Sequence, residues 1–151
     1  MQLTKYTDFA LRTLIFLGIQ PAGERVTITQ VSEHFEIPRN HLIKIVHHLA
    51  KEGFIDSVRG KGGGIKLGLP AEEINLRDLI QATEETLRPV NCAHPRCPIV
   101  GHCGLRGILF DAQEAFLNEL SKHSLADLCG PERGLTQLLH LKQSSPVRAQ
   151  A

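Results

Sequence analysis

Residues 27–69 read TITQVSEHFEIPRNHLIKIVHHLAKEGFIDSVRGKGGGIKLGL. The first part, Thr27–Phe35, predicts a short helix with Thr27 or Thr29 as its N-cap, and Pro38 predicts a break after it. Apolar side chains then recur at helical spacing from Arg39 to Glu52. Gly53 predicts the end of this second helix, because glycine is common just beyond a helix C-terminus. The stretch therefore begins as a helix–turn–helix.

Two short strands are expected next, over residues 54–58 and 65–69. The segment RGKGGG, residues 59–64, lies between them and is typical of a glycine-rich hairpin tip. A helix over residues 3–19, with Thr4 as its N-cap, is expected ahead of the stretch. The predicted fold class is mainly α with a small β-hairpin wing, and residues 1–70 form a winged helix–turn–helix domain.

Three further segments follow this domain. Residues 71–103 are expected to hold a short helix, over 76–83, and a cysteine-containing loop. Residues 104–129 are expected to hold a long dimerisation helix and a further helical turn over 124–128. The long helix carries an apolar stripe too large for the preceding domain to cover, with packing inside one chain as the alternative: Leu105, Ile108, Leu109, Ala112, Phe116 and Leu120. Residues 130–151 are expected to form a C-terminal helix or tail, disordered from Ser144 onward.

Basic side chains gather in one segment of a chain whose net charge is only +1. Residues 39–66 hold six Lys or Arg, three His and two Asp or Glu. Such a stripe is typical of a phosphate-binding surface, with a solvated helix face as the alternative. The candidate DNA-binding residues lie on the second helix of the pair and on the hairpin tip, where they would reach the major groove, phosphates or the minor groove: Arg39, Asn40, His41, Lys44, Arg59 and Lys61.

No arrangement of nucleophile and base points to an enzyme. His47 and His48 lie on a helix with no Ser or Cys nucleophile close by in the sequence and are expected to be surface residues. The N-terminus does not resemble a secretory signal, and no apolar run approaches the ~18 residues of a membrane span. We therefore expect a cytoplasmic protein with no membrane partner, in which thiols stay reduced.

Three cysteines lie in one short segment, Cys92, Cys97 and Cys103, with the spacing C-x4-C-x5-C. Pro, Gly and His surround them, so the three thiols are not expected to be core residues together. The spacing leaves three alternatives open: an iron–sulfur cluster, a zinc site completed by a nearby histidine, and structural or redox thiols. Cys129 stands apart and is expected to be a packed thiol.

Over residues 1–139 the chain resembles the winged-helix iron–sulfur regulators of the NsrR/IscR family. The resemblance rests on MQLT and TD near the N-terminus, RNHLIKI (39–45), VRGKGGGI (58–65), VNC (90–92) and LADL (125–128). The cysteine spacing is similar to that of the nitric-oxide-sensing members. IscR-like members have a wider first gap and a histidine where this chain has Arg106.

The resemblance implies a homodimeric repressor that senses nitric oxide and binds an inverted-repeat operator in double-stranded DNA at nitrosative-stress genes. It implies one iron–sulfur cluster per subunit, 4Fe-4S with 2Fe-2S as the alternative, bound by Cys92, Cys97, Cys103 and Asp8 of the partner subunit. Read without the resemblance, Asp8 is an acid in a first helical turn, stabilised by the helix dipole. A pair between Asp8 and Arg12 is not favoured. The alternatives are an iron–sulfur-biogenesis or redox-sensing regulator of the same family, a zinc-stabilised DNA-binding module, and a cluster-bearing electron carrier.

Overall fold

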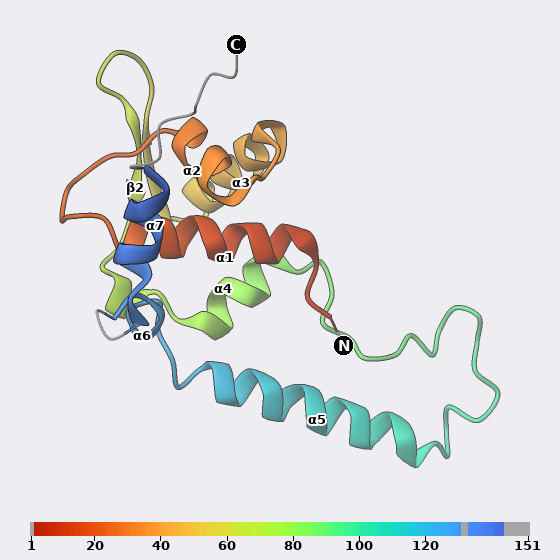
Figure 1. The fold of residues 1–151 in the computed structure, drawn as a ribbon. Coiled ribbons are helices and arrows are strands. Elements are labelled where there is room, and N and C mark those ends of the chain that lie inside the picture. The colour runs from red at the N-terminus through yellow and green to blue at the C-terminus, as the bar shows by residue number, and fades with distance from the viewer. Residues whose placement is uncertain (1, 131–132, 144–151) are drawn as a thin grey trace, which may run out of the picture.

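The computed structural model describes residues 2–130 and 133–143 (Figure 1). Its elements in chain order are α1 (Lys5–Gly18), α2 (Ile28–Phe35), α3 (Arg39–Lys51), β1 (Ile55–Val58), β2 (Gly64–Leu67), the short 3-10 helix η1 (Ala71–Glu73), α4 (Leu76–Thr83), α5 (Gly104–Leu120), α6 (Ala126–Cys129) and α7 (Leu135–Gln143). This order confirms a mainly helical fold with a β-hairpin wing. The tail expected to be disordered from Ser144 lies outside the described residues.

The helix boundaries follow from local capping. The Thr4 hydroxyl accepts a hydrogen bond from the Thr7 backbone N–H and caps α1. Thr27, rather than Thr29, caps α2 in a capping box with Gln30. Beyond α3, Gly53 has a φ of +85°, a left-handed conformation that glycine adopts without strain.

The core of the winged-helix head, residues 1–70, lies where α1, α2, α3 and the hairpin meet. In Figure 1, α1 runs beneath α2 and α3, and the hairpin rises beside them. The antiparallel register places Ile55 opposite Leu67 and Val58 opposite Gly64. Val26 makes an isolated bridge to Ile65, with N···O distances of 3.0 and 2.8 Å, which ties the hairpin to the segment ahead of α2. Helix α3, the predicted recognition helix, and the hairpin wing are therefore held by one shared core.

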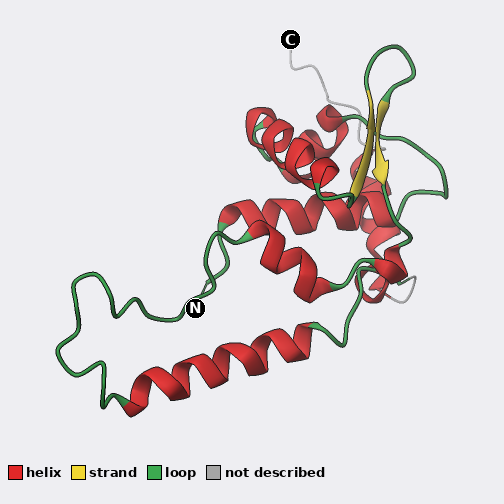
Figure 2. Cartoon of the chain, turned by 180° about the vertical axis from the view of Figure 1, so that it is seen from behind, coloured by secondary structure: helices red, strands yellow, loops and turns green. Residues whose placement is uncertain are grey.

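Helix α5 lies apart from the head. Figures 1 and 2 show it below α4, joined on one side by a long irregular loop, residues 84–103. Its buried residue is Leu117, which is outside the predicted stripe. Arg77 of α4 donates to Asn118 at 3.0 Å, so the C-terminal half of α5 stays near α4. Leu105 and Ile108, in the N-terminal half, remain 61% and 66% exposed.

Candidate functional site

The outer face of α3 is polar and basic, as the sequence predicts. Leu42, Ile45, Val46 and Leu49 are buried on its inner face. The four candidate contact residues are exposed: Arg39, Asn40, His41 and Lys44. His41 lies toward α1, where its ring stacks on Phe9 with centroids 6.3 Å apart.

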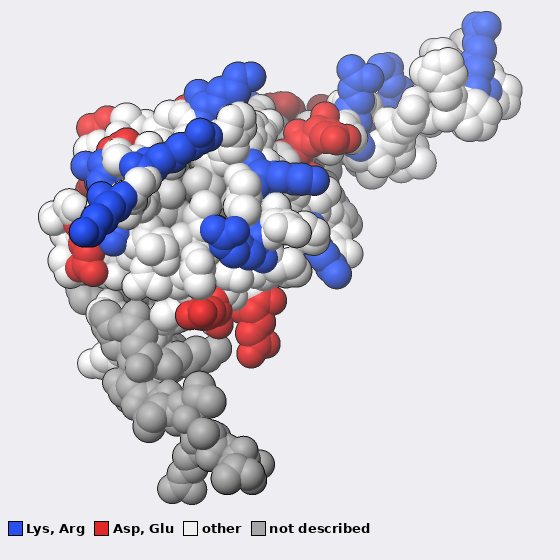
Figure 3. All heavy atoms as spheres, turned by 90° about the horizontal axis from the view of Figure 1, so that it is seen from above, with Lys and Arg blue, Asp and Glu red and all other residues white. Residues whose placement is uncertain are grey.

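The hairpin adds the second half of this basic face. Arg59 and Lys61 are exposed at its tip. Figure 3 looks down on the face that carries α2, α3 and the hairpin, and Lys and Arg side chains spread across it. A groove of about 590 Å³ separates α3 from the hairpin, with Arg39 on one wall and Arg59 on the other. The shape and charge suit a nucleic-acid backbone.

An ion pair braces the root of the hairpin. Arg25 donates to the Asp56 carboxylate at 2.7 Å, and Lys66 lies 3.7 Å from the same oxygen. The hydrogen bond from Arg25, helped by the charges of both cations, lowers the pKa of Asp56 below its usual value. Gly64 allows the close approach beneath, because a Cβ there would lie 2.8 Å from the Val26 carbonyl oxygen.

Helix α1 touches the recognition helix through two aromatic side chains. The Tyr6 hydroxyl and Nδ1 of His48 are hydrogen-bonded at 2.8 Å, and burial raises the pKa of Tyr6. His47 is exposed as expected, whereas His48 is partly buried by its contact with Tyr6. Phe9, three residues after Tyr6, provides the second contact through His41. A displacement of α1 would therefore act on α3 at two points.

Asp8 lies between these two aromatic residues in the sequence, and it pairs with Arg12. The two side chains make a double contact, at 2.9 and 3.0 Å. The prediction against this pair is wrong: their i,i+4 spacing on α1 brings them together. Both side chains are nearly half exposed, so the pair contributes little to stability and is cheap to open.

A buried hydroxyl pair fixes the start of the cysteine loop against the start of α1. The Thr7 hydroxyl donates to the Thr83 hydroxyl at 3.0 Å, and Thr83 donates to the Leu79 carbonyl at 2.9 Å. Glu84, where the loop begins, accepts from the backbone N–H and the hydroxyl of Thr4. Sequence reasoning missed this contact because its partners lie about 80 residues apart. Two threonines on otherwise apolar helix faces are the signal that points to it.

The three loop cysteines are free and half-buried: Cys92, Cys97 and Cys103. The Cys97 N–H donates to the Cys92 carbonyl at 3.1 Å, so one turn connects the first two. Within the described residues, no three His, Cys, Asp or Glu side chains lie close enough to hold a metal ion. The described part of the single chain thus supplies three thiols on one loop, but it does not bring them close enough together to bind a metal ion.

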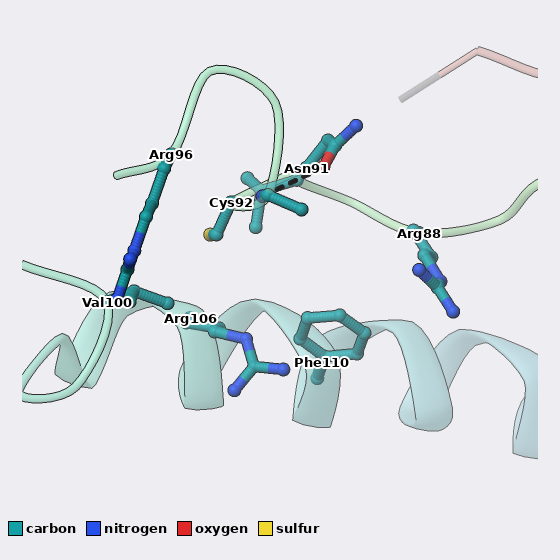
Figure 4. Close-up of a pocket in the computed structure, with 9 residues that line it drawn as sticks. Arg88, Asn91, Cys92, Arg96, Val100, Arg106 and Phe110 are labelled. Atoms are coloured by element: carbon teal, nitrogen blue, oxygen red, sulfur yellow. Dashed lines mark hydrogen bonds between the residues drawn. The ribbon is translucent and has the colours of Figure 1, made fainter. Parts of the chain in front are cut away.

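The surroundings of Cys92 are cationic. A cavity of about 550 Å³ opens between the loop and α5 (Figure 4), and Cys92, Arg88, Arg96 and Arg106 lie on its wall. Arg106 also lies over the Phe110 ring, 5.4 Å from its centroid. In the described part of the chain, these three arginines form no ion pair. A cationic cavity beside free thiols fits a thiolate-bound, anionic group, and a long irregular loop is uncommon unless it serves a function.

Cys129 is a structural thiol. Its Sγ lies 3.8 Å from the Ile15 carbonyl oxygen and so close to Gly18 that a Cβ there would be 2.6 Å away. Burial raises the pKa of Cys129 to about 11. The expectation of a packed thiol is confirmed.

A family model, Rrf2, described as an iron-dependent transcriptional regulator, matches residues 3–131. The chain belongs to the Rrf2 family. It is 38% identical over 146 residues to the HTH-type transcriptional regulator NsrR of Bacillus subtilis (strain 168), and the match covers 95% of this chain and 100% of the relative. It is therefore a transcriptional regulator with a DNA-binding winged helix and not an enzyme, and the electron-carrier alternative finds no support among these relatives.

Two solved structures share the fold. CymR, the global cysteine regulator of B. subtilis, has a TM-score of 0.70 at 21% identity, and the match covers 85% of this chain and 96% of CymR. T. potens IscR has a TM-score of 0.68 at 16% identity, with 100% and 93% covered. Both confirm the architecture predicted from the sequence. No helix among the described residues is long and apolar enough to cross a membrane.

Proposed function

We propose that this protein is a cytoplasmic, homodimeric repressor that responds to nitric oxide through an iron–sulfur cluster in each cysteine loop. The observation that carries the proposal is the place of the three free cysteines. Their loop begins at Thr83 and Glu84, which are bonded to the start of α1, and it ends where α5 begins. The similarity to the B. subtilis regulator NsrR supports the same assignment.

The proposed dimer would use the uncovered face of α5. Leu105 and Ile108 are more than half exposed although they lie on the apolar side of an amphipathic helix. A second copy of α5 offers the same apolar face, which suits a twofold-symmetric contact. Pairing two copies would also bring each cysteine loop toward a second chain.

The proposed ligands are Cys92, Cys97, Cys103 and Asp8 of the partner subunit. A bound cluster, 4Fe-4S in preference to 2Fe-2S, would supply iron, with which nitric oxide reacts. Asp8 is suited to binding the cluster reversibly. Its exposed pair with Arg12 costs little free energy to open, and the pair can form again when Asp8 leaves the cluster. Arg12 thus competes for the carboxylate.

The position of Asp8 on α1 would link the cysteine loops to DNA. Tyr6 and Phe9, on either side of Asp8, contact α3 through His48 and His41. Two recognition helices in a dimer must match successive major grooves, about 34 Å apart. A small rotation of each α1 would therefore disturb both half-site contacts, and we expect the cluster-loaded form to repress and the nitric-oxide-treated form to release DNA.

The test is anaerobic purification, iron and sulfide analysis, and gel-shift binding to an inverted-repeat operator with and without nitric oxide. We expect iron and sulfide in every subunit and a loss of DNA affinity as nitric oxide is added. Cys97→Ser should lose both metal and response, and Cys129→Ala, the matched control, should keep both. Zinc without sulfide, or DNA affinity unchanged by nitric oxide, would overturn the proposal.

A further inference from the structure

The groove between α3 and the hairpin contains exposed apolar side chains in the middle of a basic face. Ile43 on α3 is 40% exposed, and Val58 at the end of β1 is 46% exposed. Both line the groove that Arg39 and Arg59 flank. The isoleucine side chain of Ile43 cannot bind phosphate, and it is not buried in the core of the winged helix.

Ile43 occupies a defined position on α3. Arg39, Ile43 and His47 are spaced four residues apart, so they form one stripe along the helix. All three line the groove, whereas the neighbouring Leu42 is fully buried; Val46 also borders the groove but is only 4% exposed. The stripe therefore presents a cation, an apolar side chain and an imidazole in succession to whatever enters the groove.

We propose that Ile43 is a specificity-determining residue that packs on the C5-methyl group of a thymine in each operator half-site. Thymine is the base that carries a methyl group in the major groove, and apolar side chains are its usual contacts. Isoleucine has no donor or acceptor, so this contact would distinguish thymine from cytosine by the methyl group alone. The inference rests on the proposed DNA binding of α3.

Val58 should act differently although it is similarly exposed. It lies at the end of β1 next to Arg59, whose expected partner is phosphate or the minor groove. Loss of its side chain should lower affinity evenly, without a change in the preferred base. Val58→Ala is thus the matched control for Ile43→Ala.

The experiment begins with selection from a random duplex library by full-length, anaerobically prepared protein. The wild type should select an inverted repeat with a thymine at one fixed position of each half-site. Ile43→Ala should lose the preference at that position only, and Val58→Ala should keep it. The dependence of affinity on salt should be unchanged in Ile43→Ala but reduced in slope by about 1 in Lys44→Ala.

The second step replaces the selected thymine by deoxyuridine, which removes only the methyl group. Loss of one buried methyl-sized contact predicts about fourfold weaker binding per half-site and about 15-fold for both. Ile43→Ala should be insensitive to the replacement. Unchanged wild-type affinity for the deoxyuridine duplex, or equal sensitivity in Ile43→Ala, would overturn the proposal. If the wild type selected no sequence, DNA reading by α3 would itself be wrong. The deoxyuridine result on wild-type protein stands even if Ile43→Ala does not fold.

Discussion

The uncovered face of α5 permits a quantitative test of dimerisation. Ile108 is 66% exposed in the single chain and lies in the half of α5 that is away from Leu117. We predict that Ile108→Asn weakens the association of two copies, because an amide would replace an apolar side chain on the proposed contact face.

The magnitude follows from the exposed fraction. Complete burial of an isoleucine side chain is worth about 1.5–3 kcal/mol. Two-thirds of Ile108 remains to be buried, which is worth about 1–2 kcal/mol, and a twofold-symmetric contact includes this residue twice. The expected weakening is about 2–4 kcal/mol, or about 30- to 1000-fold in the dissociation constant. Burial of the amide without a partner would add to this loss.

Sedimentation over a range of protein concentrations measures the dissociation constant directly. Leu69→Asn is the matched control, since Leu69 is also exposed but lies beyond the hairpin and far from α5 in the sequence. Circular dichroism should show the same helix content in both variants. Operator affinity should fall in parallel with dimerisation, because two half-sites require two recognition helices.

A dimer of Ile108→Asn that dissociates within threefold of the wild-type concentration would refute the assignment of this face. So would an equal weakening by Leu69→Asn, since that would indicate a general effect of an added surface amide. In either case α5 would have to be covered by something other than a second copy.

Three further predictions concern the Thr7–Thr83 hydrogen bond, the Cys129 thiol and the Arg25–Asp56 ion pair. Thr83→Val should lower the free energy of unfolding in urea by about 1–2 kcal/mol, because the buried Thr7 hydroxyl loses its acceptor, whereas Thr83→Ser should not; equal loss in both would contradict this. Cys129, with its pKa raised by burial from 9.0 to about 11, should be alkylated about 100-fold more slowly at pH 8 than an ordinary thiol, as mass spectrometry of iodoacetamide-treated protein can measure. Asp56→Asn should lower thermal stability at pH 7 but not in strong acid. Arg25 lowers the pKa of folded Asp56, so this stability is present above the unfolded pKa of about 3.9 and is lost as pH falls through the folded pKa. A constant difference between the melting temperatures from pH 7 to pH 2 would exclude this role.

The fold could be predicted closely because its signals are local. Thr4, Thr27 and Gly53 each mark a helix end through contacts within a few residues. The basic face could be predicted for the same reason, since its residues lie on one helix and one hairpin. Apolar side chains at helical spacing then placed the opposite face of α3 in the core.

Contacts between distant segments could not be predicted in this way. Tyr6 and His48 are 42 residues apart, and Thr7 and Thr83 are 76 apart, so no local pattern joins them. The grouping of the loop cysteines is a different case. The sequence sets their spacing, but within the described residues no three His, Cys, Asp or Glu side chains lie close enough to hold a metal ion, so the spacing did not reveal how the thiols lie in space.

The contacts of α1 explain how this helix could serve two proposed functions, the binding of the partner's cluster through Asp8 and the positioning of α3. The exposed Asp8–Arg12 pair is cheap to open, whereas the Thr7–Thr83 bond is buried and costly to break. A signal that changes the partner of Asp8 would therefore move α1 as one unit with Thr83, where the cysteine loop of the same chain begins, because the Thr7–Thr83 bond would stay intact. In a dimer where each Asp8 serves the other subunit's loop, a change at one loop would reach the second through the same helix. The response at two half-sites would then be coupled without any contact between the two recognition helices.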